Sequence, residues 1–219
     1  MKAVIFRRHG GPEVLEVAEV PSPRPSQGQI LVHVKACSLN HLDVWIRQGI
    51  PAYTITLPHI AGADVAGIVE AVGPEVTGVR IGDRVLLAPG ISCGQCDWCQ
   101  RGEDNLCRSY GIRGVACDGG YAQWTAAAVT HAIPIPEGIT FEEAAAFPLV
   151  FLTAWHMLVA RAKLQAGETV LVHAAGSGVG HAAIQVAKFL KATVYTTVGS
   201  EGKMAKAKAL GADAVINTQ

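Results

Sequence analysis

Four cysteines lie close together near the middle of the chain, and their spacing constrains the fold more than any other feature. They follow the pattern Cys93-x2-Cys96-x2-Cys99-x7-Cys107. Four thiolates at this spacing can close tetrahedrally around one Zn²⁺, and a site with four sulfur ligands leaves no position open for a substrate. We therefore predict one structural zinc, which holds together a lobe poor in apolar residues. The alternative is four cysteines that merely share a loop.

The surroundings of this lobe favour a metal over disulfides. Arg101 and Arg108 can offset the negative charge of a zinc–tetrathiolate centre. The chain has 6 cysteines, and its first residues contain no long apolar stretch of the kind found in a secretory signal. We therefore expect a reducing, cytoplasmic setting. Cys37 and Cys117, which lie outside the pattern, are expected to be small buried residues.

Composition excludes several classes of partner. The chain of 219 residues has 18 Lys+Arg and 18 Asp+Glu, so its formal net charge is zero. Nucleic acids and anionic membranes require clustered positive charge, so we expect neither as a partner. The best candidates for a span, the uncharged runs at residues 144–160 and 169–187, are interrupted by Pro148 and by glycines, and the first is shorter than the roughly 20 apolar residues that a bilayer requires. We predict no membrane span.

The first part of the chain has the pattern of a small, irregular β domain. Turn-forming glycines and prolines recur at short intervals, as in residues 10–12 and 21–25. Between the turns, Ile30, Val32 and Val34 occupy every second position of a short run, which is typical of a half-buried strand.

The second part has the pattern of alternating strands and helices. We expect a helix over residues 141–160 interrupted at Pro148, a strand over 169–173, a helix with apolar residues from 179 to 190, a strand over 193–198, a helix over 203–210 and a third strand from 214. Strand–helix–strand order predicts a parallel, doubly wound sheet. The fold class is therefore α/β plus β, with the β domain first.

The predicted parallel sheet has fewer strands than a dinucleotide-binding sheet, which has about six. One edge of the strand at 169–173 would remain open, and an open apolar edge invites aggregation. We therefore expect these residues to be a piece of a longer protein.

A small-residue turn joins the first parallel strand to its helix and is the second chemical signal. Its residues are Ala175, Gly176, Ser177, Gly178, Val179 and Gly180. Small residues let the backbone approach a pyrophosphate, which can bind at the helix N-terminus. The frame matches G-x-G-x-x-G only in part, so a tight turn without a ligand is the alternative.

The end of the second parallel strand bears on the choice of nucleotide. An acidic residue there would bind the ribose 2′-hydroxyl of NAD. Instead the strand ends with Gly199 and Ser200, and Lys203 follows, which favours the 2′-phosphate of NADP(H). Glu201 keeps NAD(H) open, because a small shift in register would place it at the ribose.

The order of these parts, together with two further motifs, resembles a known family. The motifs are Gly62-Ala63-Asp64-x2-Gly67-x5-Gly73-x2-Val76 and Ala36-Cys37-Ser38-Leu39-Asn40-His41-Leu42-Asp43. The chain resembles the medium-chain dehydrogenase/reductase superfamily, in its group of zinc-containing alcohol dehydrogenases and quinone oxidoreductases. The resemblance implies a GroES-like catalytic domain with the zinc lobe over residues 1–150 and the first part of a Rossmann domain over 151–219.

Three departures from this family concern its catalytic zinc. Where its alcohol dehydrogenases have ligands, this sequence has Asn40, Ala63 and Leu149. Neither alanine nor leucine can donate to a metal, and losing a catalytic zinc removes a Lewis acid. These departures are similar to the quinone oxidoreductase and enoyl-reductase branches, which act without zinc.

The resemblance also implies roles for individual residues. Asn40 and Tyr53 would donate to a developing oxyanion, His41 would face substrate or the cofactor phosphates, Asp43 would orient its neighbours, and Thr153 would lie beside the nicotinamide. A purely structural role is the alternative for three of them: Asn40 capping a turn, Tyr53 as a rim aromatic, and Asp43 paired with Arg47. His59 and His173 are expected to be structural, the latter because it would end a buried strand.

We therefore expect hydride transfer between a nicotinamide, NADP(H) more than NAD(H), and a quinone, enone or related carbonyl compound, without catalytic zinc. One alternative is a zinc alcohol dehydrogenase that uses ligands such as His41, Asp43 and His59. Another is an inactive nucleotide-binding fragment. The resemblance further implies a small-molecule substrate and a homo-oligomer, a dimer or tetramer.

Overall fold

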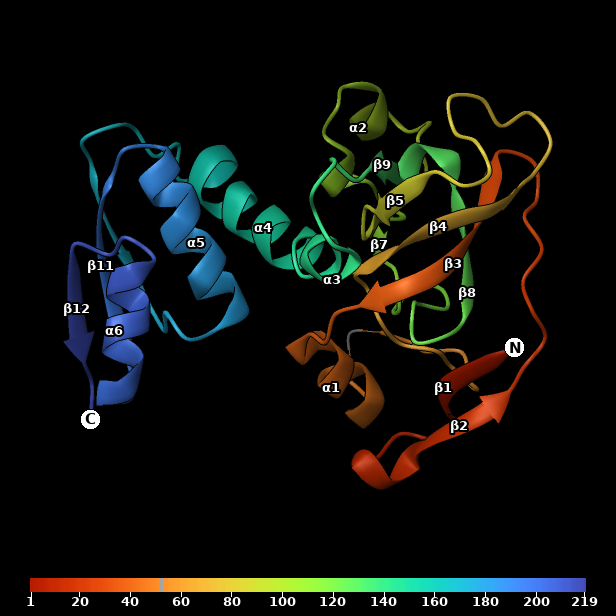
Figure 1. Ribbon diagram of the computed structural model, residues 1–219, viewed down its shortest axis with the longest axis horizontal. Helices are drawn as coiled ribbons and strands as arrows, with labels where there is room; N and C mark the ends of the chain where they lie inside the picture. The colour runs from red at the N-terminus through yellow and green to blue at the C-terminus, as the bar shows by residue number, and fades with distance from the viewer. Residues whose placement is uncertain (52) are drawn as a thin grey trace. The chain divides into compact units, whose positions relative to one another are not determined.

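The structure, a computed structural model, describes residues 1–51 and 53–219 (Figure 1). Contacts between residues divide the chain into two compact units, Met1–Pro148 and Leu149–Gln219. The boundary expected after residue 150 lies close to this division. Each unit has its own buried core.

An antiparallel sheet of five strands forms the centre of the first unit. The strand order is β8-β3-β4-β5-β9. Ile30 and Val32 of β3 are fully buried and pack with Val65 and Val69 of β4, which confirms the alternation expected in this segment. The strands are β3 (Gln29–Cys37), β4 (Val65–Val72), β5 (Arg84–Leu87), β8 (Trp124–Ala128) and β9 (Ala132–Pro134).

A hairpin and a short helix complete the main body of this unit. β1 (Lys2–Phe6) pairs antiparallel with β2 (Leu15–Glu19), and a 3₁₀ turn, η1 (Pro12–Val14), precedes β2. The helix α1 (His41–Gln48) directly follows β3 and buries Ile46 against an apolar cluster that includes Phe6. The end of β3, the start of α1 and the hairpin thus belong to one packed region.

The cysteine lobe is built from very short elements. They are β6 (Gly90–Ile91), α2 (Asp97–Gln100), η2 (Asp104–Leu106) and β7 (Gly111–Ile112). β6 and β7 pair with each other, and α2 contacts η2. No residue of α2 or η2 is buried, so the lobe has little apolar core of its own. A 3₁₀ turn, η3 (Val129–His131), then leads into β9, and the unit ends with α3 (Phe141–Ala145).

The second unit contains a parallel sheet with helices packed against it. The strand order is β10-β11-β12, and both pairings are parallel, as predicted. The elements are α4 (Pro148–Trp155), a π-helical turn η4 (His156–Arg161), β10 (Thr169–Val172), α5 (Gly178–Phe189), β11 (Thr193–Val198), α6 (Glu201–Ala209) and β12 (Ala214–Asn217). The interruption expected at Pro148 is confirmed, since α3 ends before it and α4 begins there.

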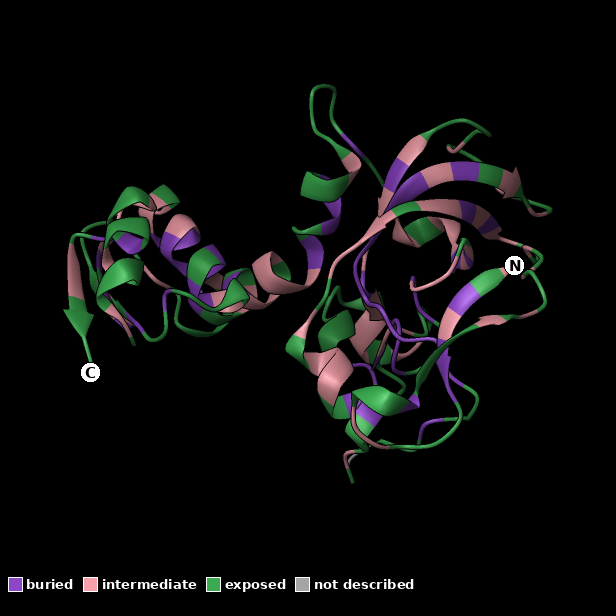
Figure 2. Ribbon diagram, turned by 60° about the horizontal axis from the view of Figure 1, so that its bottom comes forward, coloured by how far each residue is buried: buried purple, intermediate pink, exposed green. Residues whose placement is uncertain are grey.

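Burial follows one face of α5. Ala183, Ile184 and Ala187 are buried against Val194 of β11, whereas Phe189 at the helix end is exposed. Figure 2 shows that buried and exposed stretches alternate along the helices of the chain. In contrast, β10 has no strand on its other side among the described residues, and Leu171 is 51% exposed.

Two expectations about burial are wrong. His173 follows β10 and is exposed, because β10 is an edge strand and its end is not covered within the described residues. Cys117 is also exposed, whereas Cys37 is partly buried. Cys117 lies in a loop beside Asp118 at the surface, so the general preference of cysteine for the interior does not hold there.

No helix within the described residues is long and apolar enough to cross a bilayer.

Candidate functional site

The four cysteine thiols converge in the lobe of the first unit. The Sγ atoms of Cys93, Cys96, Cys99 and Cys107 all lie within 4.8 Å of one another. Cys96 and Cys99 Sγ are 3.5 Å apart, and Cys93 and Cys99 Sγ are 3.9 Å apart. Sulfurs bound tetrahedrally to zinc at about 2.3 Å are separated by about 3.8 Å, so these residues fit the metal.

The backbone already supports thiolates at this position. The Cys96 N–H donates to Cys93 Sγ at 3.4 Å, and the Cys93 N–H donates to Cys107 Sγ at 3.4 Å. Backbone N–H bonds, first from Gln95 and then from Cys96, lower the pKa of Cys93 to about 6. Hydrogen bonds of this kind orient metal ligands and offset their charge.

Arg101, which was expected to offset the charge of the cysteine cluster, contacts Trp98 and Glu103. Its guanidinium lies 4.5 Å from the centre of the Trp98 ring, and its Nε pairs with Glu103 at 3.3 Å. Arg101 therefore fixes α2 to the segment that follows it.

A second cluster of polar groups surrounds the start of α1. Its centre is Asp64, which is 1% exposed and immediately precedes β4. Asp64 Oδ2 accepts hydrogen bonds from Ser38 Oγ and Asn40 Nδ2, both at 2.9 Å. The Asn40 side chain is therefore held by a buried carboxylate, and Asn40 is also the N-cap residue of α1, where it forms a capping box with Asp43.

Asp43 forms the other half of this cluster. Its Oδ2 accepts from the Asn40 N–H at 2.7 Å and from the Tyr121 hydroxyl at 2.7 Å. Its Oδ1 accepts from the Gly62 N–H at 3.2 Å. Asp43 thus joins α1 to the segment before β4 and to the segment before β8. No ion pair with Arg47 is found within the described residues.

Gly62 can occupy its place in this cluster because it has no side chain. Its φ is +102°, in the region that favours glycine. A Cβ there would lie 2.8 Å from the Tyr121 ring and 2.9 Å from Cys37 Sγ. The close approach explains why the motif that contains Asp64 begins with glycine.

Burial beside these carboxylates keeps the neighbouring acids protonated. Desolvation, followed by the hydrogen bond to Asp43, raises the pKa of Tyr121 far above its ordinary value. Desolvation and the charges of Asp43 and Asp64 raise the pKa of Cys37 to about 12. Tyr121 is therefore a fixed hydrogen-bond donor and Cys37 a neutral thiol at physiological pH.

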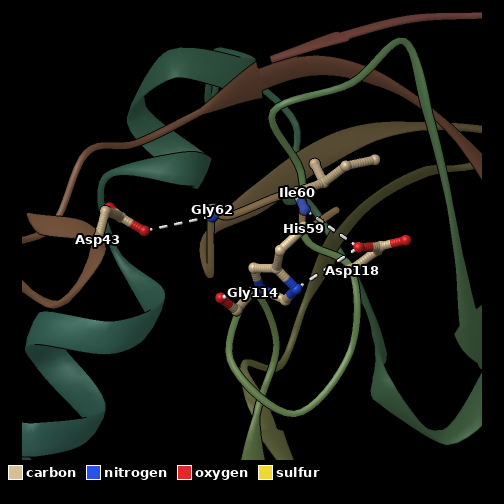
Figure 3. A network of polar contacts seen from close by, with 6 residues as sticks. All are labelled: Asp43, His59, Ile60, Gly62, Gly114 and Asp118. Carbon is tan, nitrogen blue, oxygen red and sulfur yellow. Dashed lines mark hydrogen bonds and ion pairs between the residues drawn. The ribbon is translucent and has the colours of Figure 1, made fainter. Parts of the chain in front are cut away.

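The alternative zinc ligands His41, Asp43 and His59 are not brought together. His59 is 3% exposed; its Nε2 lies 2.9 Å from the Gly114 carbonyl and its Nδ1 lies 3.7 Å from Asp118 (Figure 3). His41 is exposed and stacks edge-on against Trp45, with ring centroids 4.8 Å apart. The four cysteines form the only metal-ligand group found across residues 1–51 and 53–219.

Tyr53 is 44% exposed, and its N–H donates to the Ile50 carbonyl. No contact within the described part of the chain links its side chain to Asn40 or Asp43. Tyr121, which the sequence motifs did not indicate, donates its hydroxyl to Asp43 in the cluster. The only available signal was its position after Gly119-Gly120, which permits close packing.

The small-residue turn has the geometry of an anion-binding helix start. Ser177 caps α5, and its Oγ accepts from the Gly180 N–H at 3.0 Å. A Cβ on Gly180 would collide with the Ala174 carbonyl oxygen, so glycine is required there. The first N–H groups of a helix have no partner within the helix, so those in the first turn of α5 can bind a phosphate.

Lysines line a hollow of about 340 Å³ beside this turn. Its walls include Ala175, Gly176, Lys203 and Lys206. A Cβ added to Gly176 would lie 3.3 Å from Lys203 Cδ, so the lysine stem passes over the turn. Ser200 precedes α6 as its N-cap residue, without a side-chain cap bond. These contacts bring Lys203 to the turn that the sequence pattern predicted for a pyrophosphate.

Thr153, expected beside the nicotinamide, lies in α4. Its Oγ1 donates to the Leu149 carbonyl at 2.7 Å, one turn earlier in the same helix. The hydroxyl proton is therefore used within the helix, while the oxygen can still accept a hydrogen bond.

Two family models match the chain. The model described as "Alcohol dehydrogenase GroES-like domain" matches residues 26–137. The model described as "Zinc-binding dehydrogenase" matches residues 178–219. The matches correspond to the two units, and they confirm the expected fold class of a GroES-like domain followed by a Rossmann-type sheet.

Individual relatives support the same assignment. An alcohol dehydrogenase of Geobacillus stearothermophilus is 38% identical over 99% of this chain and 64% of its own length. A quinone oxidoreductase of Homo sapiens is 35% identical over 92% of this chain and 54% of its own length. A crystal structure of an NAD-dependent alcohol dehydrogenase has a TM-score of 0.96 at 51% identity, covering 100% of this chain and 64% of that one.

The chain thus spans between about half and two thirds of the length of these relatives. Its sequence motifs, both family models and relatives of both kinds lead to the same assignment. The chain belongs to the medium-chain dehydrogenase/reductase superfamily, in the group of oxidoreductases that contains the zinc-binding alcohol dehydrogenases and the quinone oxidoreductases.

Proposed function

We propose that the protein containing this chain catalyses hydride transfer between NADP(H) and a quinone, an enone or a related carbonyl compound, without a metal at the substrate. The observation that carries this proposal is the hydrogen bonding of Asn40. By the family resemblance, this residue stands where the alcohol dehydrogenases have a zinc ligand. The Asn40 amide donates a hydrogen bond to the buried Asp64. Ala63, which precedes Asp64 in the sequence, has no side-chain atom that could bind a metal. An amide held in this way would have its second N–H left for a substrate oxygen.

Zinc has a different place in this proposal. Cys93, Cys96, Cys99 and Cys107 would hold one ion with sulfur on all sides. Such an ion contributes to the folding of the lobe and has no open coordination position for a substrate.

Residues of the turn before α5 and of the start of α6 would hold the nucleotide. The turn from Ala175 to Gly180 would bind the pyrophosphate, and Ser200 and Lys203 would bind the 2′-phosphate. A bound nicotinamide supplies or accepts the hydride. Support for NADP(H) over NAD(H) comes from Lys203, which lies over Gly176, and from the absence of a carboxylate among the described residues lining the hollow. The name of one similar structure states NAD dependence, and that name applies to that protein only.

Asn40 would stabilise negative charge that develops on the substrate oxygen. One well-placed donor is worth about 3 kcal/mol in the transition state. His41, exposed at the start of α1, would contact substrate or cofactor phosphates, and Tyr53 would contribute from the rim. Asp43 acts through others, since its carboxylate fixes the backbone of Asn40 and of Gly62.

A substrate panel tests the proposal directly. The natural gene product that carries these residues should oxidise NADPH with quinones or enones, faster than it reduces NADP⁺ with primary or secondary alcohols. Faster turnover of simple alcohols, lost on metal removal, would instead identify a zinc alcohol dehydrogenase. Tight NADPH binding without turnover of any panel member would favour a non-catalytic nucleotide-binding protein.

Other features of the whole protein follow from the same proposal. We expect a small-molecule substrate, a cytoplasmic location and a homo-oligomer, a dimer or tetramer. We also expect residues 1–150 to act as the catalytic domain and residues 151–219 to contribute to nucleotide binding.

A further inference from the structure

An apolar hollow of about 640 Å³ lies within the first unit, and the proposed chemistry accounts for only one side of it. Its walls come from β1, η1, β2, the end of β3 and α1. Asn40 and Asp43 are among its lining residues, and Phe6, Leu15 and Val44 supply apolar surface. This volume falls in the range of about 300 to 1,000 Å³ that is typical of small-molecule sites.

Arg47 also lines this hollow, in the last turn of α1. The residue is only 8% exposed, and its Nη1 is buried without a hydrogen-bond partner in the described part of the chain. Its guanidinium forms no ion pair with any described residue. A buried cation without a partner is costly, because its lost hydration is not replaced.

The nearby charges do not remove this cost. Asp43 lies one turn earlier on the same helix, but hydrogen bonds from Asn40, Tyr121 and Gly62 already occupy its oxygens. Glu13 is exposed, its carboxylate accepts from the Gly11 N–H at 2.8 Å, and it forms no ion pair with Arg47 within the described residues. The charge of Arg47 contributes only after backbone hydrogen bonds and Arg8 to lowering the pKa of Glu13, and water screens this exposed carboxylate. Lys35, a further charged residue on the wall, adds positive charge. An anion is therefore the group that would complete the hollow.

We propose that this hollow binds an apolar molecule that carries a carboxylate, with the carboxylate paired to Arg47. Guanidinium and carboxylate groups form two parallel hydrogen bonds, and this pairing is strongest where water is excluded. Because Asn40 lines the same hollow, the inference deepens the proposed function and rests on it in one respect: the bound molecule would be the substrate, an enone or carbonyl compound with an acidic group.

Helix α1 sets the distance between Asn40 and Arg47, the two residues proposed to contact the bound molecule. Asn40 and Arg47 are seven positions apart, so their Cα atoms are separated by about 10 Å along the axis of α1. Substrates in which a carboxylate and a reducible carbonyl are separated by a short apolar chain or a ring match this spacing better than α-oxo acids do.

Binding of a matched pair of probes tests this inference without cofactor or turnover. The probes are 4-phenylbutanoate and 4-phenylbutanamide, which share shape and differ in charge, titrated by calorimetry into the natural gene product. We expect the carboxylate to bind at least tenfold more tightly than the amide. Arg47→Met should abolish this preference, Arg47→Lys should retain part of it, and the control Arg80→Met, at an exposed arginine, should leave it unchanged.

Thermal unfolding of the variants separates a binding role from a structural one. Since Arg47 is an unpaired buried charge, Arg47→Met should fold with an unchanged or raised Tm. Equal binding of the two probes to the unmodified protein would overturn the inference, and this result does not depend on any variant. So would an unchanged carboxylate preference in Arg47→Met.

The two proposals fail in different ways. Carboxylate preference without any hydride transfer would contradict the proposed function and keep the binding site. Hydride transfer without carboxylate preference would keep the proposed function and reject the role of Arg47.

Discussion

Asp43 and Asp64 organise the candidate substrate site through hydrogen bonds that come from distant parts of the chain. Asp64 holds the side chain of Asn40, and Asp43 holds its backbone. The two carboxylates therefore fix both the position and the rotamer of one amide. A donor fixed in advance needs no reorganisation when charge develops, which is the basis of its catalytic value.

Removing the Asn40 amide should reduce catalysis more than stability. We expect Asn40→Ala to lower kcat/KM by about a hundredfold, since one oxyanion donor is worth about 3 kcal/mol. Ser38→Ala is a matched control, because Ser38 donates to the same oxygen of Asp64 at the same 2.9 Å distance. Steady-state kinetics and chemical denaturation of both variants provide the measurement. Equal losses of activity in the two variants would show that Asn40 acts only by supporting Asp64.

Tyr121 should contribute to stability in a pH-dependent way. Tyr121→Phe removes the hydrogen bond to Asp43 and should cost about 1 kcal/mol at neutral pH. Because the folded-state pKa of Tyr121 is raised above its ordinary value of 10.0, its stabilisation is present below pH 10 and is lost as the pH rises further. The difference in denaturation midpoint between the two proteins should therefore narrow above pH 10. A constant difference from pH 8 to pH 11 would contradict this account.

At the residue scale, the spacing of the four cysteines predicted their convergence, and the family resemblance drew attention to Asn40, but neither indicated Tyr121. The cysteines converge because short turns connect them, so local spacing is sufficient. Tyr121 contacts Asp43 across 78 positions of sequence, and only the folded sheet brings them together. For the same reason the surface position of Cys117 could not be derived from its residue type.

At the element scale, the turn before α5 and the start of α6 form the candidate nucleotide site. The small residues of the turn leave room that the Lys203 side chain partly covers. Lys203 and Lys206 face the same hollow, whereas Lys208 on the same helix does not line it.

Replacing Lys203 should alter the choice of nucleotide. Lys203→Met should weaken NADPH binding about tenfold, the loss expected for one charge-assisted contact to a phosphate, and should change NADH binding little. Lys208→Met serves as the control, because it removes the same charge from α6. Nucleotide titration measured by fluorescence would decide the point. A larger effect on NADH than on NADPH would reject a 2′-phosphate at Lys203.

Disrupting the cysteine lobe should affect folding and leave the chemistry intact. Cys107 is 5% exposed, and Cys107→Ser removes one of the four sulfurs. We expect loss of zinc and rapid proteolysis between residues 90 and 112, with kcat per folded molecule unchanged. Cys117→Ser, at an exposed cysteine outside the cluster, should show neither change. Loss of turnover in a Cys107→Ser protein that keeps its stability would contradict a structural role.

The positions of helices and strands were predicted better than their irregular ends and their exposure. Alternating apolar positions and glycine turns located β3, β11 and α5, because local periodicity determines these segments. The π-helical turn after α4 was not predicted, since its hydrogen bonds depend on the irregular end of one helix. The exposure of His173 depends on which strands flank β10, and a local pattern does not contain that information.

At the scale of the whole molecule, the two units divide the proposed functions. The first holds the cysteine lobe, the Asn40 cluster and the hollow with Arg47, and the second holds the candidate nucleotide turn. The net charge of zero is that of the chain as a whole: Met1–Pro148 has 11 Lys/Arg and 15 Asp/Glu, whereas Leu149–Gln219 has 7 Lys/Arg and 3 Asp/Glu. Family membership rests on both units, since each matches its own family model.

The central claim is that zinc in this protein stabilises the lobe and does not touch the substrate. A crystal of the natural gene product with NADPH, measured above and below the zinc absorption edge, tests it most directly. We predict one anomalous peak per chain, surrounded by the sulfurs of Cys93, Cys96, Cys99 and Cys107, at about 2.3 Å each. A second zinc peak beside Asn40, with oxygen or nitrogen ligands and a bound solvent molecule, would contradict the account.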